Sequence, residues 1–147
     1  MAEKDTDWMQ ICLDLGRQAR QAGNAAVGAV IVADDQLIGA GMEAGKSKKD
    51  ITCHAEIEAI RDALQRGHSN LSAAVLYTTH EPCLMCSYVI RHHRIARIVM
   101  GVPVPEVGGY TSPFPILTTQ LVSKWGPPPA ITMGVLKKEC EALSGHG

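Results

Sequence analysis

The chain has 147 residues and a formal net charge of -1, with 46% hydrophobic and 20% charged residues. This length suits one domain, so we expect residues 1–147 to form a single unit with its own core. No run approaches the ~18 apolar residues of a membrane span, and no secretion signal precedes the first polar residues, so we expect a cytoplasmic protein without a membrane partner.

The first half of the chain alternates helical and extended patterns. Asp7 can cap a helix over Trp8–Ala22, whose apolar residues recur at helical spacing. A buried strand over Ala26–Val32 and a second over Gln36–Gly41 flank Asp34-Asp35, which predicts a hairpin. A helix over 54–66 and a strand over 74–79 follow.

The second half continues the alternation. Pro82 is suited to the first turn of a helix that reaches about Arg94, and 95–101 reads as a strand. Residues 102–129 are rich in proline and predict a surface excursion beside the active site, with a short helix over Ile116–Trp125. A brief strand from Ile131 and a helix to Leu143 end the pattern. Alternating strands and helices predict an α/β layered sheet with crossover connections.

The candidate chemistry lies in two short motifs, His54-Ala55-Glu56 and Pro82-Cys83-Leu84-Met85-Cys86. One His and two Cys are three ligands of the kind that catalytic zinc takes while keeping its fourth position open for water. Glu56 is placed to move protons on and off that water. The pattern H-x-E…P-C-x-x-C is the signature of zinc deaminases that act on nucleobases.

Both motifs stand at predicted helix N-termini, where partial positive charge stabilises thiolates. Two other interpretations use the same residues. A C-x-x-C pair can be a redox pair, and a structural zinc would need a fourth ligand, for which Cys53 and His80 are the candidates. A structural site would give Glu56 no role. Five cysteines without extracellular context argue against a disulfide framework.

On these motifs the chain resembles the cytidine deaminase-like superfamily. The resemblance extends to Val27–Val32, Leu76–Cys86, Arg94–Val99 and 131–140, and is strongest to the branch of tRNA adenosine, guanine and fungal-type cytosine deaminases. It implies an α/β fold of three layers, α/β/α, around a central five-stranded mixed sheet, and usually a homodimer. It also implies that Zn²⁺ on His54, Cys83 and Cys86 activates water, and that catalytic Glu56 transfers its protons. Backbone N–H groups near Ala55 and Cys83 would stabilise the negative charge that develops in the transition state.

The sequence departs from the pattern of this branch at one position. In the branch, the second strand ends in Gly-x-Gly-x-Asn, and the Asn amide recognises the base. This chain has Gly39-Ala40-Gly41-Met42-Glu43. An amide donates and accepts hydrogen bonds, whereas an ionised carboxylate only accepts. The hypothesis is that the substrate presents N–H donors to Glu43. The alternative is a surface Glu43 paired with Lys46 or Lys48.

Two further residues are candidates for substrate binding. Asn24, just before the first strand, can face the pocket or serve as a buried turn residue. His80, directly before Glu81-Pro82, can line the pocket or lie exposed at a strand end.

The net charge guides the choice of substrate. A protein that holds nucleic acid through phosphates usually carries a basic stripe. The densest basic stretches here, 46–49 and 91–94, are typical of solvated surface. The loop after the fourth strand also lacks the pattern of the tRNA branch. We therefore expect a deaminase of a free base, nucleoside or related aminated heterocycle, with a small-molecule partner and no nucleic acid. A tRNA adenosine deaminase is the alternative, and a non-enzymatic zinc-stabilised binding protein is the remote one.

Overall fold

The structure is a computed structural model that describes residues 2–146, with side chains from 4 to 144. A five-stranded sheet forms its centre, in the order β2-β1-β3-β4-β5. The strands are β1 (Gly28–Ala33), β2 (Gln36–Met42), β3 (Val75–His80), β4 (Arg97–Val102) and β5 (Ala130–Met133). β1 is antiparallel to β2 and β3, whereas β3, β4 and β5 run parallel. The expected five-stranded mixed sheet is confirmed.

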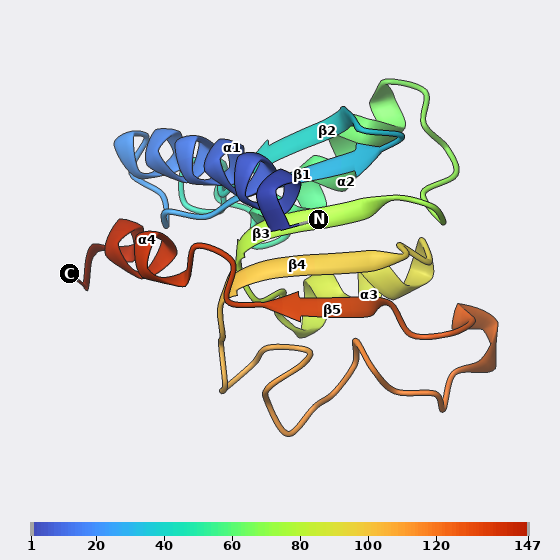
Figure 1. Cartoon of the computed structure of the whole chain (residues 1–147). Helices are drawn as coiled ribbons and strands as arrows, with labels where there is room; N and C mark the ends of the chain where they lie inside the picture. Colours follow the sequence, from blue (N-terminus) through green and yellow to red (C-terminus); the bar gives the residue numbers. More distant parts are fainter. Residues whose placement is uncertain (1, 147) are drawn as a thin grey trace.

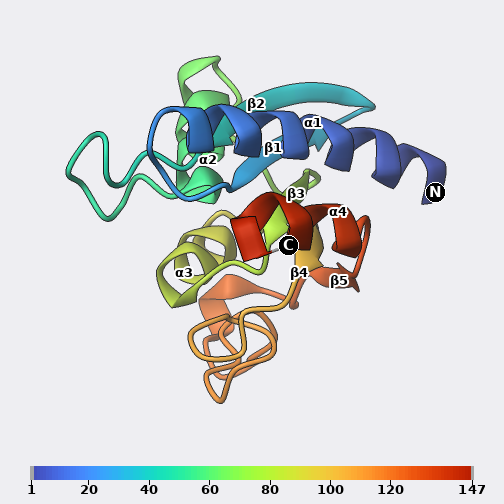
Figure 2. The same cartoon turned by 90° about the vertical axis from the view of Figure 1, so that its left-hand side faces the viewer.

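Helices cover both faces of the sheet, which gives the three layers (Figure 1). α1 (Ala2–Gln21) and α4 (Lys137–Glu141) pack on one face, and α2 (Ala55–Gln65) and α3 (Leu84–His92) on the other. In Figure 2, α2 and α3 lie to the left of the strands. Each face has its own apolar core, because residues of one strand alternate between the faces. Leu76, for example, packs with α2 and α3, whereas Tyr77 packs with α1 and α4.

The carboxyl ends of β2 and β3 lie at the same edge of the sheet, since both strands are antiparallel to β1. α2 and α3 therefore begin at this edge, with His54 and Cys83 as their N-cap residues. Gly41 lets α2 approach β2, because a Cβ there would lie 2.4 Å from the Ala55 carbonyl oxygen. The topology thus brings the two sequence motifs together.

Two predicted helices differ from the structure. α1 starts at Ala2, so Asp7 lies inside the helix and the prediction that it caps the start is wrong. The predicted helix over Ile116–Trp125 is also wrong. Only a 3-10 turn, η1 (Ser123–Trp125), forms there, because the carbonyl oxygens of Ile116 and Thr119 accept hydrogen bonds from buried Arg91.

A π-helical turn, η2 (Ala142–His146), follows α4. Within residues 2–146, no helix combines the length and the apolarity that crossing a membrane requires.

Candidate active site

Three potential metal ligands converge where α2 and α3 begin. The Nδ1 atom of His54 lies 3.5 Å from the Sγ atoms of Cys83 and of Cys86, and all three ligand atoms lie within 4.8 Å of one another. A tetrahedral zinc with Zn–S bonds of ~2.3 Å and Zn–N bonds of ~2.0 Å separates a sulfur from a nitrogen ligand by about 3.5 Å. The donor set and its spacing therefore fit zinc.

The protonation of these ligands also suits a cation. A hydrogen bond from Cys86, helped by His54, lowers the pKa of the Cys83 thiol to about 4. The hydrogen bond with Cys83 raises the pKa of His54 to about 9, and Glu43 and Glu56 add to this shift through their charges. Interaction with Cys83, together with burial, raises the pKa of Cys86. Zinc would meet one thiolate and displace protons from the other two ligands.

Glu56 points its carboxylate at this cluster from the first turn of α2. The side chain is 4% exposed, and burial raises its pKa to about 7. Its Oε1 lies 3.8 Å from Cys86 Sγ, and its Oε2 lies 3.1 Å from the hydroxyl of Thr78 on β3. A carboxyl group with a pKa near neutrality can both take and give a proton under physiological conditions.

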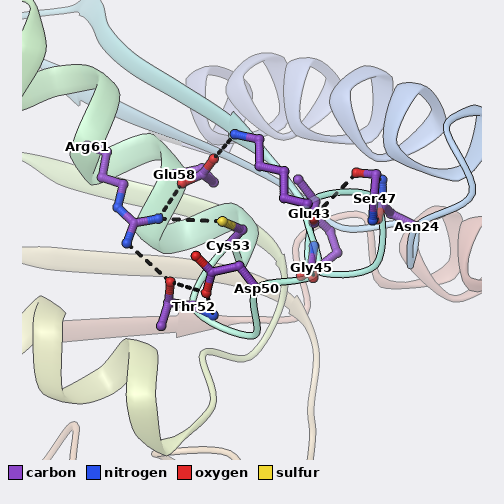
Figure 3. A network of polar contacts seen from close by, with 11 residues as sticks. Asn24, Glu43, Gly45, Ser47, Asp50, Thr52, Cys53, Glu58 and Arg61 are labelled. Atoms are coloured by element: carbon purple, nitrogen blue, oxygen red, sulfur yellow. Dashed lines mark hydrogen bonds and ion pairs between the residues drawn. The ribbon is translucent and has the colours of Figure 1, made fainter.

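The loop over 43–53 borders the site and is fixed by polar contacts (Figure 3). Asn24 holds it from the turn between α1 and β1: its Oδ1 accepts from the Ser47 N–H and its Nδ2 donates to Ser47 Oγ, both at 3.0 Å. Arg61 points from α2 toward Cys53 and Thr52 and anchors the end of the loop. Both polar atoms of the Asn24 amide thus bind Ser47 in the middle of the loop, and the role of Asn24 in substrate binding stays a prediction.

Glu43 lies at the end of β2, half-buried, and accepts a hydrogen bond from the Gly45 N–H at 3.1 Å. It shares the lining of a cavity of about 700 Å³ with Asn24 and Ser47. Lys48, one of its two proposed salt-bridge partners, pairs instead with Glu58 at 2.9 Å. Glu43 is also close enough to His54 to influence its pKa. Recognition of the substrate by Glu43 stays a prediction.

The other two predicted substrate residues lie in different environments. Ala55 is the first residue of α2 and is fully buried. His80 ends β3, where Nδ1 lies 2.9 Å from Thr79 Oγ1 and Nε2 lies 2.7 Å from Ser144 Oγ. His80 therefore joins the strand to the C-terminal turn, and substrate contact by either residue stays a prediction.

A buried carboxylate that the sequence did not single out organises the wall of the site. Glu81 is 3% exposed and accepts hydrogen bonds from the N–H groups of Val104, Tyr110 and Thr111 and from the Thr111 hydroxyl. The same segment pairs with the metal-ligand turn, since Leu84 N–H donates to the Val107 carbonyl. The one feature of the sequence that could have pointed to Glu81 is its position, as an acidic residue directly before Pro82-Cys83.

Thr78 is the second residue that sequence reasoning missed. It stands with Thr79 in β3, and both side chains are fully buried. A pair of hydroxyls inside a buried strand indicates polar partners, yet the partner of Thr78 lies on a different element.

Comparison with known proteins agrees with this geometry. The family model for the cytidine and deoxycytidylate deaminase zinc-binding region matches residues 2–102. The chain is 36% identical over 141 residues to a tRNA-specific adenosine deaminase of Haemophilus influenzae, which covers 95% of this chain and 80% of that protein. A similar relative in Agrobacterium fabrum is 37% identical over 113 residues, covering 76% and 74%.

The solved structures include one from a study of A-to-I editing by tRNA:A34 deaminases at the wobble position of transfer RNA. It matches with a TM-score of 0.86 and 30% identity, over 94% of this chain and 99% of that one. The fold, the ligand set and these matches define a zinc-dependent hydrolytic deaminase. The chain belongs to the family of the cytidine and deoxycytidylate deaminase zinc-binding region.

One expectation is contradicted by these relatives. We expected a small-molecule partner and no nucleic acid, but the relatives matched over most of their length are named for tRNA. The expectation rested on the net charge of the whole chain and on the loop after the fourth strand, which lacks the pattern of the tRNA branch. The net charge is a poor guide to binding, because phosphate contacts depend on where the cationic side chains lie.

Proposed function

We propose that this protein deaminates adenosine to inosine in tRNA, at the wobble position. The relatives named for this activity support the proposal, because their similarity extends over most of this chain. The observation that carries the chemistry is the buried Glu56 carboxyl beside the His54, Cys83 and Cys86 cluster.

The residues divide the work between binding and proton transfer. His54, Cys83 and Cys86 would hold zinc, which when bound lowers the pKa of water toward ~7 and so supplies hydroxide at neutral pH. Glu56 takes the proton that the attacking water loses and delivers it to N1 of the adenine ring. As the C6–N6 bond breaks, Glu56 takes the second proton from the hydroxyl now on C6 and transfers it to the departing amine, so that this oxygen becomes the carbonyl of inosine. Water and adenosine thereby become inosine and ammonia.

The loop over 43–53 supplies cations next to the site for a polyanionic substrate. Lys46, Lys48 and Lys49 are exposed on it, and the loop leads directly to His54. Such cations are suited to contacts with phosphate groups. A tRNA substrate also accords with a cytoplasmic location, and a homodimer stays a prediction.

A substrate panel tests the proposal. Ammonia release would be measured with the zinc-loaded protein on free bases, nucleosides, nucleotides and a tRNA anticodon stem-loop, with Glu56→Gln as the blank. We expect turnover of the stem-loop that requires intact Glu56. Turnover of a free base or nucleoside with no activity on the stem-loop would contradict the proposal.

A further inference from the structure

Thr78 is the contact of Glu56 that lies outside the metal-ligand set. It is on β3, on the face that carries Leu76 and packs against α2, and it is fully buried. Its Oγ1 lies 3.1 Å from Glu56 Oε2 and 3.0 Å from the carbonyl oxygen of His80.

The other side-chain contact of Glu56 changes when metal binds. Cys86 donates its thiol hydrogen to Glu56 Oε1 at 3.8 Å, but a cysteine that ligates zinc is a thiolate and has no proton to donate. Among the side chains described, 4–144, the Thr78 hydroxyl is then the remaining donor to this carboxylate.

A hydroxyl suits this position because it both donates and accepts. Thr78 Oγ1 lies between the Glu56 carboxylate and the His80 carbonyl oxygen, within hydrogen-bond distance of both. The hydroxyl therefore ties the carboxyl group to the backbone at the end of β3.

We propose that Thr78 is a positioning residue for the deamination, whose hydroxyl holds the Glu56 carboxyl in the orientation that proton transfer requires. The inference rests on the proposed function, in which Glu56 moves the protons. Proton transfer is sensitive to such placement, and a shift of about 1 Å in a reacting group can lower a rate about 100-fold.

Kinetics of three variants test the role. Thr78→Val keeps the shape and removes the hydroxyl, and we expect kcat to fall about 10- to 100-fold with KM within about twofold of wild type. Thr78→Ser restores the hydroxyl and is expected to recover most of kcat. Thr79→Val is the matched control: Thr79 is equally buried on the same strand, but its Oγ1 contacts the Gly28 N–H and the His80 ring instead. Its kcat is expected to stay within about threefold of wild type, since Glu56 keeps its anchor.

Thermal unfolding separates this inference from the choice of substrate. If the Thr78–Glu56 hydrogen bond exists in the zinc-loaded protein, the Tm shifts of Thr78→Val and Glu56→Ala will not add in the double variant. Additive shifts, or an unchanged kcat in Thr78→Val, would overturn the positioning role. A wild-type protein that is inactive on the stem-loop but shows non-additive Tm shifts would contradict the proposed substrate and support the positioning role.

Discussion

Two buried carboxylates lie close to the metal ligands, and their surroundings differ. Glu81, before Cys83, receives four hydrogen bonds from a single segment of the wall. Glu56, at the start of α2, has one hydroxyl and one thiol as side-chain contacts. Both are nearly inaccessible, at 3% and 4% exposure.

The number of hydrogen-bond donors around each carboxylate indicates whether it has a structural or a chemical role. A buried carboxylate that accepts four hydrogen bonds fixes the backbone segment that donates them. In a buried carboxylate with few donors, burial disfavours the ionised form. Its pKa therefore rises, and it can exchange a proton near neutral pH. Glu81 is therefore expected to govern stability, and Glu56 to govern turnover.

The largest expected effect is on catalysis at Glu56. General acid–base catalysis contributes about 10²- to 10⁴-fold, so Glu56→Gln should lower kcat by about 10³-fold while zinc content stays at wild-type level. Single-turnover assays and metal analysis check this. A variant that loses zinc together with activity would assign Glu56 a role in metal binding instead.

The same variant has a predicted effect on stability. The pKa of Glu56 rises from 4.5 to about 7 on folding, so the folded state holds the proton more tightly than the unfolded state. The stability of the metal-free protein should therefore fall as the pH rises through this interval. Glu56→Gln removes that loss, and its metal-free Tm at a pH of about 8 should exceed that of wild type.

Glu81→Gln is expected to act on stability. An amide accepts through one oxygen, and its NH₂ group would face N–H donors that now contact a carboxylate oxygen. Buried donors without acceptors cost about 1–3 kcal/mol each, so the free energy of unfolding should fall by about 3 kcal/mol in urea titrations. Glu106→Gln is the control on the same segment, since Glu106 is exposed and should change stability by less than about 0.5 kcal/mol. Equal losses in both variants would remove the distinction between the two carboxylates.

The ligands of the cluster predict how zinc affinity depends on pH. With the pKa of His54 near 9, that of Cys86 raised and that of Cys83 near 4, zinc displaces two protons at neutral pH. Affinity should then rise about 100-fold per pH unit between about pH 6 and pH 8, measured by chelator competition. A slope near zero would show that the ligands are already deprotonated.

The smallest expected effect is at Glu43. If its carboxylate accepts an N–H of the substrate, Glu43→Gln should lower kcat/KM by about tenfold, the value of one hydrogen bond to a charged group. Unchanged rate and substrate preference would reject this role and leave Glu43 as the partner of the Gly45 N–H.

The sequence predicted those parts of the site that depend on local spacing. Cys83 and Cys86 share one helix turn, and His54 and Glu56 share another, so the ligand set followed from the motif and the fold from the alternation of elements. The partners of Glu56 and Glu81 could not be predicted, because each joins segments that only the tertiary fold brings together. Thr78 is 22 residues from Glu56, and Tyr110 is 29 from Glu81.

The incorrect helix boundaries have the same origin. Arg91, buried under the 102–129 excursion, takes backbone carbonyls that a helix over Ile116–Trp125 would use, and its guanidinium lies 5.1 Å from the centre of the Trp125 ring. At the other end of the chain, the Asp5 carboxylate binds Arg97 and Tyr77, which anchors the start of α1 on the sheet. Local sequence signals carry no information about such distant contacts.

The most direct test is formation of inosine in a tRNA anticodon stem-loop, with adenosine either at the wobble position or moved elsewhere in the loop. The zinc-loaded wild-type protein should produce inosine at the wobble position only, and Glu56→Gln should produce almost none. Absence of inosine from both stem-loops, with ammonia released from a free base, would contradict the assignment to tRNA.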